Sequence, residues 1–347
     1  MKEVIVFAGG GTLGHILPAL SMASALKKDN PNNQIIFMMT RKDERYDFIK
    51  EKSFIDQIYY YDINGLNRKN PIRNIWNFIK ILLNISKIKE PLMEATMVIG
   101  MGGYISAIVI KLAKKLKKIL IIHEQNKILG LANKIVINDV DLVLSAFPLD
   151  IKNKRCKVIG NPRLNDAKNY LHFLPIKNHI LVTSGSLGSK SINFLIVEFL
   201  KTNTSKKYFT TLITGKRYYE EIKSLLKEDT HYQILPFVDD LLEYMSKASF
   251  VISRAGASTI FEIIGLEKPA IIIPSPNVTG NHQYHNALFL KEQKACVLLE
   301  EKDLNLSSLN KYIEYAIDNM VIKDNLKRIS KTYELVDWKK EIKDVRK

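Results

Sequence analysis

A structural unit that recurs along the chain constrains its fold more than any other feature. In this unit a short, continuous apolar run leads into a turn rich in glycine or serine, and a helical pattern follows. The unit appears after the apolar runs at 4–8, 98–99, 180–183 and 250–252. Short apolar runs that alternate with helices are typical of parallel strands buried on both faces of a sheet. We therefore predict an α/β chain whose strands form doubly wound parallel sheets.

The units occur in two successive sets, which predicts two domains. With 347 residues the chain is long enough for two ordinary domains, each with its own core. Gly160, Asn161 and Pro162 break the first set, and the second set starts near residue 180. We expect domains at 1–160 and 161–347, with the residues up to about 178 connecting them. The last helix, in the basic C-terminal stretch, is a candidate for packing back on the N-terminal domain.

Composition excludes several classes of protein. A hydrophobic content of 46% with 25% charged residues is typical of a globular chain. Cys156 and Cys296 are isolated, so we expect neither a disulfide framework nor a metal cluster, and a reducing cytoplasm fits. We find no apolar run with the length of a signal peptide core or a membrane span. The net charge of +16 indicates an anionic partner, but neither zinc-ligand spacing nor an RNA-binding motif supports nucleic acid.

The stretch at 252–262, ISRAGASTIFE, is the strongest candidate for a phosphate site. It predicts a strand end, a tight turn and a helix start, where unpaired N–H groups and a partial positive charge attract anions. Ser258 and Thr259 add hydroxyl donors. Glu262 lies one turn further on the same face, where a carboxylate can accept two ribose hydroxyls. The same spacing also fits a capping box formed by Thr259 and Glu262, and the two interpretations are compatible.

The first glycine turn has the glycine spacing of a dinucleotide-binding fingerprint but lacks its acidic residue. Gly9, Gly11 and Gly14 match its spacing, which alone is a weak signal. Binding of NAD also needs an acidic residue at the end of the second strand, but the strand expected at 34–39 is followed by a threonine and two basic residues. We therefore expect this turn to hold a phosphate and not NAD.

His15 follows the first glycine turn, at the start of a predicted helix. An imidazole is the usual general base near neutral pH, and at this position it faces whatever the turn binds. The alternative is a histidine that only hydrogen-bonds the turn.

Residues 65–95 interleave basic and apolar side chains at roughly helical spacing. Such a helix can lie in a membrane interface with its lysines on anionic headgroups. The alternative, which this pattern alone favours, is an ordinary helix whose apolar face belongs to the core. The basic residues are Arg68, Lys69, Arg73, Lys80, Lys87 and Lys89, and the apolar ones are Ile72, Ile75, Trp76, Phe78, Ile79, Leu82 and Leu83.

Two pairs of polar residues resemble metal ligands but fit other roles better. His123 and Glu124 close the strand expected at 119–122, and nothing nearby completes a ligand set. Asp139 and Asp141 lead into the apolar run at 142–144, so a strand start is the better interpretation. We therefore expect no metal site.

Taken in order, the turns resemble those of the MurG family, the peptidoglycan N-acetylglucosaminyltransferases of glycosyltransferase family 28. The matching segments are GGGTLGHILP, GMGGYIS, HEQNKILGLAN, VIGNPR, SGSLGS, RAGASTIFE and NHQYHNA, from about Val4 to Ala287. The resemblance implies a GT-B fold, in which two Rossmann-like domains face a cleft. The N-terminal domain would bind the acceptor and the C-terminal domain UDP-N-acetylglucosamine.

The resemblance also implies a reaction. N-acetylglucosamine would pass from UDP, with inversion, to the C4 hydroxyl of the muramyl sugar of lipid I, an undecaprenyl-linked acceptor, giving lipid II for peptidoglycan synthesis. Such an enzyme needs neither metal nor cofactor, and it works as a peripheral protein on the cytoplasmic face of the cell membrane. The stretch at 65–95 and the basic run at 111–118 would then bind the anionic membrane that carries the acceptor.

The resemblance assigns roles residue by residue. His15 is the implied catalytic base. Arg163 and the turn at 256–259 are implied to stabilise the charge of the departing UDP, and the main chain of Val238 to read uracil. The implied acceptor-binding residues are Thr12, Gly14, Gly102, Gly103, Tyr104, Glu124 and Asn126. The implied UDP-sugar-binding residues are Thr12, Leu13, Gly14, His15, Asn126, Arg163, Ser186, Val238, Ala257, Ser258, Thr259, Glu262, Gln283 and Asn286.

Three positions depart from the family's usual turns, which read GGTGGH and GGSQGA or GGSRGA. Leu13 replaces a glycine, and Ser184 and Leu187 replace a glycine and a polar residue. A leucine in the first turn narrows the approach to a pyrophosphate, and the other two changes remove a contact to the donor sugar.

Three other functions stay open. The first is another GT-B transferase that acts on a glycolipid, against which only the HEQN segment and the acceptor-side glycines argue. The second is a UDP-N-acetylglucosamine epimerase, which would need further carboxylates around the sugar that we do not identify. The third is a nucleotide-binding protein without catalysis, against which the presence of His15 argues.

Overall fold

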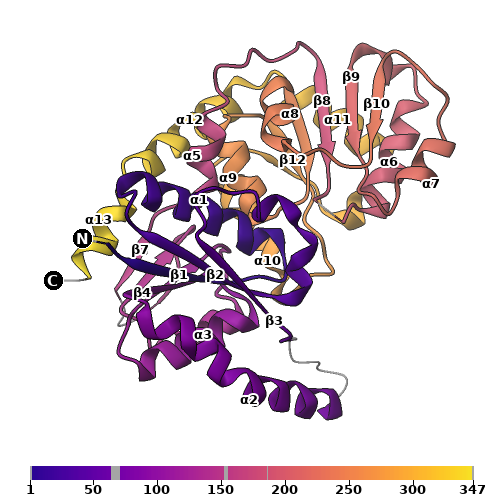
Figure 1. The fold of residues 1–347 in the computed structure, drawn as a ribbon. Helices are drawn as coiled ribbons and strands as arrows, with labels where there is room; N and C mark the ends of the chain where they lie inside the picture. Colours follow the sequence, from indigo (N-terminus) through magenta and orange to yellow (C-terminus); the bar gives the residue numbers. More distant parts are fainter. Residues whose placement is uncertain (1, 64–70, 152–154, 186, 346–347) are drawn as a thin grey trace. The chain divides into compact units, whose positions relative to one another are not determined.

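The computed structural model describes residues 2–63, 71–151, 155–185 and 187–345, and for 71–80, 82 and 83 it describes the backbone alone. The predicted site residue Ser186 and most side chains of the stretch at 65–95 therefore lie outside the described residues. The chain forms two compact units: unit 1 is Met1–Pro162 with Val336–Lys347, and unit 2 is Arg163–Leu335. Both units are α/β, as predicted (Figure 1).

Unit 1 is built on a seven-stranded sheet whose neighbouring strands are parallel. Its elements are β1 (Val4–Ala8), α1 (Leu13–Asp29), β2 (Gln34–Thr40), η1 (Arg41–Arg45), η2 (Asp47–Ile49), β3 (Gln57–Tyr61), α2 (Pro71–Glu94), β4 (Met97–Gly100), α3 (Gly103–Lys115), β5 (Ile119–Glu124), α4 (Leu131–Val136), β6 (Leu142–Ser145), β7 (Cys156–Val158) and α13 (Trp338–Asp344).

The strand order in unit 1 is β3-β2-β1-β4-β5-β6-β7. The last residue of β1, Ala8, lies opposite Met38 of β2 and Gly100 of β4. The direction of winding reverses between β1 and β4, and open α/β sheets bind ligands beyond the carboxyl ends of the strands at such a point. The turns that follow β1 and β4 therefore occupy the ligand-binding position of this unit.

The side chains of successive residues of β1 point to opposite faces of the sheet. Ile5 and Phe7 pack with α1 and with Trp338 of α13, whereas Val6 and Ala8 pack with α3 and the C-terminal part of α2. Helices α1 and α13 thus cover one face, and α2 and α3 cover the other (Figure 1). Because both faces are buried, the strand is apolar at every position.

Unit 2 is built on a six-stranded sheet, again with parallel neighbours. Its elements are α5 (Arg163–Lys168), β8 (His179–Thr183), α6 (Lys190–Leu200), η3 (Thr204–Lys207), β9 (Phe209–Ile213), α7 (Tyr219–Ser224), β10 (Tyr232–Leu235), α8 (Leu241–Lys247), β11 (Phe250–Ser253), α9 (Ala257–Gly265), β12 (Ala270–Ile272), η4 (Thr279–Asn281), α10 (His282–Glu292), β13 (Val297–Leu298), η5 (Glu301–Asp303), α11 (Leu306–Ala316) and α12 (Met320–Glu334).

The strand order in unit 2 is β10-β9-β8-β11-β12-β13, so β8 and β11 flank the reversal of winding. Ser253 at the end of β11 lies opposite Thr183 of β8 and Ile272 of β12. The described residues that follow these two strands, 184–185 and 254–258, therefore lie at the ligand-binding position of unit 2.

We expected the residues up to about 178 to be only a connecting segment, but they include a helix that packs within unit 2. Helix α5 begins at Arg163 and packs closely on α9, with Leu164 and Ala167 buried. A Cβ added at Gly265 of α9 would lie 2.6 Å from the carbonyl oxygen of Leu164, so this approach requires glycine. The prediction was wrong because a helix of six residues is too short to show a helical period.

Within the described parts of the chain, we find no helix that combines the length and the apolar character needed to cross a membrane.

Candidate active site

Two glycine turns lie against each other at the carboxyl ends of β1 and β4. A Cβ added at Gly103 would lie 2.9 Å from the carbonyl oxygen of Gly10, and one added at Gly102 would lie 3.1 Å from Nε2 of His15. Both residues also have positive φ, +96° at Gly102 and +82° at Gly103, which side chains rarely adopt. The structure thus brings three predicted site residues of unit 1 together: His15, Gly102 and Gly103.

The carbonyl of Gly10 determines the tautomer of His15. Nδ1 of His15 lies 3.1 Å from this carbonyl oxygen and 3.3 Å from Oγ1 of Thr12. Because a carbonyl oxygen only accepts hydrogen bonds, the ring donates from Nδ1, and Nε2 is the acceptor nitrogen of the neutral imidazole. A general base needs such an acceptor nitrogen. The half-buried ring presents Nε2 to Gly102 of the neighbouring turn.

The other residues predicted in the first turn lie at the start of α1. Thr12 is the N-cap and is exposed, and its side chain makes no capping hydrogen bond to the described residues. Gly14 is exposed, whereas Leu13 is half-buried and packs against the core cluster beneath α1. This packing explains how the turn accommodates leucine where the family usually has glycine. Tyr104 is half-buried in the first turn of α3.

A carboxylate that sequence analysis did not single out lies against the first turn. Both oxygens of Asp43 accept the N–H of Gly11, at 2.9 Å and 3.0 Å. Oδ2 also accepts the N–H of Thr40 at 3.1 Å and its hydroxyl at 2.6 Å, and Asp43 is fully buried. We argued against NAD because no acidic residue occurs at 40–42, directly after the second strand. An acidic residue does follow, at position 43. It binds the turn itself, so it is not available to a ribose.

Glu124 organises the loop that follows β5. Its Oε1 accepts the N–H of Asn126 at 3.0 Å, and its Oε2 accepts from the N–H of Gly130 at 2.8 Å and from Nδ2 of Asn133 at 2.9 Å. The carboxylate is buried, whereas Asn126 is half-buried. The predicted acceptor-binding role of Glu124 stays a prediction. The contacts seen here hold Asn126 in place.

The basic run at 111–118 has partners within unit 1. Asp139 binds Nζ of Lys111 at 2.5 Å and also pairs with Lys114, and the hydrogen bonds from both lysines lower its pKa. Lys118 donates to the carbonyl oxygen of Met93 at 2.7 Å. Asp139 therefore neutralises part of the positive charge that we assigned to membrane binding.

In unit 2, two predicted donor-site residues form an ion pair. Nε of Arg163 on α5 lies 2.8 Å from Oε1 of Glu262 on α9, and its Nη1 lies 2.8 Å from Oδ2 of Asp166. The side chains of Arg163 and Glu262 are only 16% and 4% exposed. Glu262 is thus fixed by an arginine from another helix, and it lies on the helix whose start is the predicted phosphate site.

The start of α9 has the features of an anion site. Gly256 is the N-cap, and no described side chain caps the helix, so the capping box proposed for Thr259 and Glu262 is not formed. The hydroxyl oxygens of Ser184, Ser253 and Ser258 are buried, and among the described residues they have no hydrogen-bond partner. These three hydroxyls lie at the ends of β8 and β11 and at the start of α9, where they could donate to an anionic ligand.

Two further predicted residues on α10 hold the turns around this helix start. Nδ2 of Asn286 donates to the carbonyl oxygen of Ala255 at 3.2 Å, and Oε1 of Gln283 accepts the N–H of Ser275 at 2.9 Å. Asn286 is fully buried, as is most of Ala257, the first residue of α9. Val238 is half-buried in the segment before α8.

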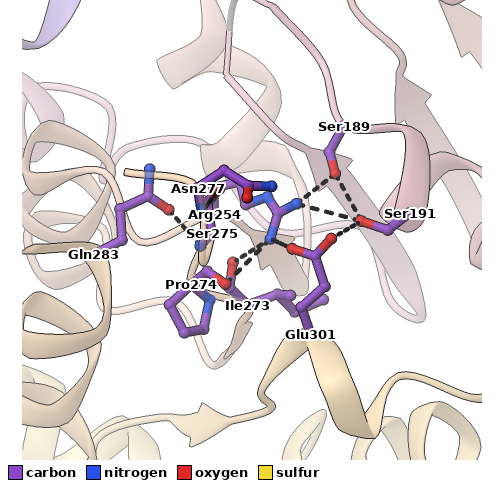
Figure 2. A network of polar contacts seen from close by, with 9 residues as sticks. All are labelled: Ser189, Ser191, Arg254, Ile273, Pro274, Ser275, Asn277, Gln283 and Glu301. Atoms are coloured by element: carbon purple, nitrogen blue, oxygen red, sulfur yellow. Dashed lines mark hydrogen bonds and ion pairs between the residues drawn. The ribbon is translucent and has the colours of Figure 1, made fainter. Parts of the chain in front are cut away.

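Arg254 links four segments at the carboxyl end of the unit 2 sheet, and Figure 2 shows its guanidinium at the centre of the network. Nη2 lies 2.6 Å from the hydroxyl of Ser189, and Nη1 lies 3.3 Å from the carbonyl oxygen of Ile273, 3.2 Å from that of Pro274 and 2.6 Å from Oε2 of Glu301. Burial would raise the pKa of Glu301, but the hydrogen bonds from Arg254 and Ser191 lower it overall. This role of Arg254 is not evident from the sequence pattern.

Comparison with known proteins identifies the family. The model of the glycosyltransferase family 28 N-terminal domain matches residues 5–144, and that of the C-terminal domain matches residues 179–342. A UDP-N-acetylglucosamine–N-acetylmuramyl-(pentapeptide) pyrophosphoryl-undecaprenol N-acetylglucosamine transferase from a Thermoanaerobacter species is 33% identical, over 94% of this chain and 95% of its own. A transferase of the same name from Listeria monocytogenes is 30% identical over 94% of both chains. The chain belongs to the MurG family of glycosyltransferase family 28.

Solved structures show that this MurG-family chain has the predicted GT-B architecture. MurG from Acinetobacter baumannii has a TM-score of 0.68 and 23% identity, and the match covers 95% of this chain and 94% of that one. A UDP-N-acetylglucosamine 2-epimerase from Methanocaldococcus jannaschii has a TM-score of 0.61 and 16% identity, covering 95% and 98%. Because an epimerase shares the fold, the fold alone does not choose the reaction, and the closer sequence relatives favour transfer.

The three residues that depart from the MurG pattern differ in how far they are buried. Leu13 is partly covered by the core, as described above, whereas Leu187 is 74% exposed. Ser184 is buried and belongs to the set of hydroxyls near the start of α9. A serine at this position of a MurG-family turn adds a polar group to the candidate anion site.

Proposed function

We propose that this chain transfers N-acetylglucosamine from UDP-N-acetylglucosamine to the C4 hydroxyl of the muramyl sugar of undecaprenyl-pyrophosphoryl lipid I, giving lipid II. The observation that carries the proposal is the match to transferases of that name over 94% of the chain. In this proposal unit 1 supplies the base and the acceptor-binding turns, and unit 2 supplies the site for the sugar nucleotide.

The geometry of unit 2 supports the donor part of the proposal. Direct transfer leaves negative charge on UDP, and fixed N–H groups and hydroxyls aimed at that charge lower the barrier. The uncapped start of α9 and the buried hydroxyls of Ser253 and Ser258 are donors of this kind. Glu262, held by Arg163 one turn further along α9, would accept the ribose hydroxyls.

The geometry of unit 1 supports the acceptor part. Inverting transfer needs one base to take the proton of the attacking hydroxyl. Nε2 of His15 is the acceptor nitrogen, because Nδ1 donates to Gly10. The proton would pass from the C4 hydroxyl to Nε2 as the oxygen attacks the anomeric carbon and the bond to UDP breaks. The starts of α1 and α3 would hold the acceptor pyrophosphate with Thr12, Gly14, Gly102, Gly103 and Tyr104.

We further propose that the protein works on the cytoplasmic face of an anionic membrane. Support comes from the net charge of +16 and from the basic and apolar residues at 65–95. Flotation of the purified protein with vesicles of phosphatidylglycerol and phosphatidylcholine tests this proposal. Binding to the mixed vesicles that weakens in high salt is expected. Equal recovery with vesicles of phosphatidylcholine alone would contradict it.

Release of UDP with and without acceptor tests the reaction against its main alternative. We expect release from UDP-N-acetylglucosamine to depend on an added lipid I analogue and to fall sharply in His15→Ala. An epimerase would instead convert the sugar nucleotide without acceptor. UDP release at the same rate with and without acceptor, or formation of the epimer, would overturn the proposal.

A further inference from the structure

A single peptide group connects Asp43 to His15. The carbonyl of Gly10 and the N–H of Gly11 belong to the same peptide unit, which is planar and trans, so the two groups point in opposite directions. The N–H is bound by the carboxylate of Asp43 at 2.9 Å and 3.0 Å, and the carbonyl lies 3.1 Å from Nδ1 of His15. Asp43, the peptide group and the imidazole therefore form one continuous series of hydrogen bonds.

The surroundings of this peptide group fix it from both sides. A Cβ added at Gly10 would lie 2.2 Å from Oδ2 of Asp43, so the carboxylate is in direct contact with the turn. On the other side, Gly103 lies close enough that a Cβ there would approach the Gly10 carbonyl oxygen to 2.9 Å. Gly10 and Gly11 have no side chains, and Gly11 has a φ of +85°, so the turn itself gives little resistance to rotation of this peptide. The hydrogen bonds, together with the packing against Gly103, therefore set the orientation of this peptide group.

We infer that Asp43 is a positioning residue for His15 and acts through the peptide group between Gly10 and Gly11. The negative charge holds the N–H inward, which turns the carbonyl toward Nδ1 and keeps Nε2 as the acceptor nitrogen. Hydrogen bonds in series also polarise one another, so the carboxylate strengthens the carbonyl as an acceptor. Asp43 itself contacts neither ring nitrogen. The role of His15 as base rests on the proposed function, but its tautomer does not.

The same charge has a second consequence for the turn. Glycine turns before helices commonly bind phosphate through their free N–H groups, as we expected from the sequence. Here the N–H of Gly11 already binds an internal anion that is fully buried. A pyrophosphate is therefore directed to the starts of α1 and α3 and away from the N–H of Gly11.

The simplest alternative is that Asp43 only caps η1, since it also binds the N–H and hydroxyl of Thr40. Two control variants separate the roles. Thr40→Val removes the hydroxyl donor of the cap and leaves the contact with Gly11. Glu44→Gln removes a charge from the exposed neighbour on the same 3-10 helix. Both variants keep the carboxylate of Asp43, which binds the N–H of Gly11.

The experiment uses the full chain labelled with ¹⁵N-histidine, with His15→Ala to assign one signal among the seven histidines. In the wild type we expect the ¹⁵N shifts of His15 to report protonation at Nδ1. Asp43→Ala should give a mixture of tautomers, and Asp43→Asn, whose amide oxygen still accepts from Gly11, should restore part of the wild-type ratio. Thr40→Val and Glu44→Gln should match the wild type. This readout needs no transfer activity.

Kinetics provide the second readout. A misplaced base lowers kcat, so we expect Asp43→Ala to reduce kcat about 100-fold and Asp43→Asn about tenfold, with KM for UDP-N-acetylglucosamine unchanged. If the alanine variant does not fold, the asparagine variant decides the question. A wild-type tautomer and kcat in Asp43→Asn would overturn the inference, as would an equal loss in Thr40→Val. If the wild type transfers no sugar, the proposed function fails, and the tautomer measurement still decides the role of Asp43.

Discussion

Arg163 and Glu262, 99 residues apart in the chain, form an ion pair in which Nε of Arg163 lies 2.8 Å from Oε1 of Glu262. The pair joins α5 to α9, and both side chains are largely buried. A buried charge is stable only with its partner, so the carboxylate of Glu262 has a fixed position one turn beyond the candidate phosphate site. In the proposed function, this carboxylate binds the ribose.

We expect Glu262→Gln to weaken the binding of UDP. Loss of a hydrogen bond from a ribose hydroxyl to a charged acceptor costs about 1.5 kcal/mol, which corresponds to about a tenfold rise in Kd. Calorimetric titration with UDP measures this value. Asp166→Asn is the matched control, because it removes the other carboxylate that binds Arg163. An unchanged Kd in Glu262→Gln, or an equal rise in Asp166→Asn, would remove Glu262 from the ribose site.

Arg254→Lys tests the network in Figure 2. Lysine keeps the charge but lacks the planar fork with which Arg254 reaches Ser189, Glu301 and two carbonyl groups at once. We expect the turns after β8, β11 and β12 to loosen and the Kd for UDP to rise about tenfold, the usual size of a lost charged hydrogen bond. Arg328→Lys, at an exposed position on α12, is the control. Equal Kd values for the two variants would show that the network does not hold the donor site.

His15→Ala should lower kcat by about 100-fold or more, the usual contribution of a general base. The Kd for UDP should stay near the wild-type value, because the groups that we propose for its phosphates and ribose, at the start of α9 and at Glu262, lie in unit 2. Steady-state transfer assays and calorimetry give the two quantities. His172→Ala, which removes an exposed histidine of unit 2, should behave as the wild type. If kcat is unchanged in His15→Ala, another group is the base.

His123 should make the stability of unit 1 depend on pH. The side chain is fully buried, with Nε2 lying 3.3 Å from the carbonyl oxygen of Gly160, and burial lowers its pKa to about 4. The unfolded chain, with an ordinary histidine pKa near 6.5, therefore binds a proton at a pH where the folded chain does not. Stability is full above about pH 6.5 and falls as the pH drops toward about 4, and we expect a loss of about 2 kcal/mol between about pH 7 and pH 5.

His123→Gln provides the comparison for this pH dependence. Glutamine can donate to the carbonyl of Gly160 and does not titrate. Urea unfolding at the two pH values should show a smaller loss in this variant than in the wild type. Equal losses would mean that other groups cause the acid sensitivity.

The strands and turns that carry the site are predictable from sequence, because both faces of each sheet are covered and the strands are continuously apolar. The strand β3 was not predicted, since its residues, QIYYY, are mostly half-exposed at the sheet edge. The starts of α3 and α9 could also be predicted from sequence, because Gly102 and Gly256 directly precede these helices.

The contacts of the site could not be predicted in the same way. Asp43 lies in the charged run RKDER, where its neighbours on η1 are exposed, and its spacing from Thr40 fits a cap but does not point to Gly11. Arg254 stands in the candidate phosphate-binding turn, and it pairs with Glu301, which is distant in the chain. Such partners are distant in the chain, so local patterns carry no information about them.

Transfer of radiolabelled N-acetylglucosamine from UDP-N-acetylglucosamine to a lipid I analogue, by purified protein with added chelator, tests the central claim most directly. The account predicts a labelled lipid product with the new sugar on the muramyl C4 oxygen in the inverted configuration, and one UDP released for each sugar transferred. Transfer should persist with the chelator present. Tight binding of UDP without any labelled lipid would contradict the claim, and it would leave a sugar-nucleotide site whose acceptor is another glycolipid or whose reaction is epimerisation.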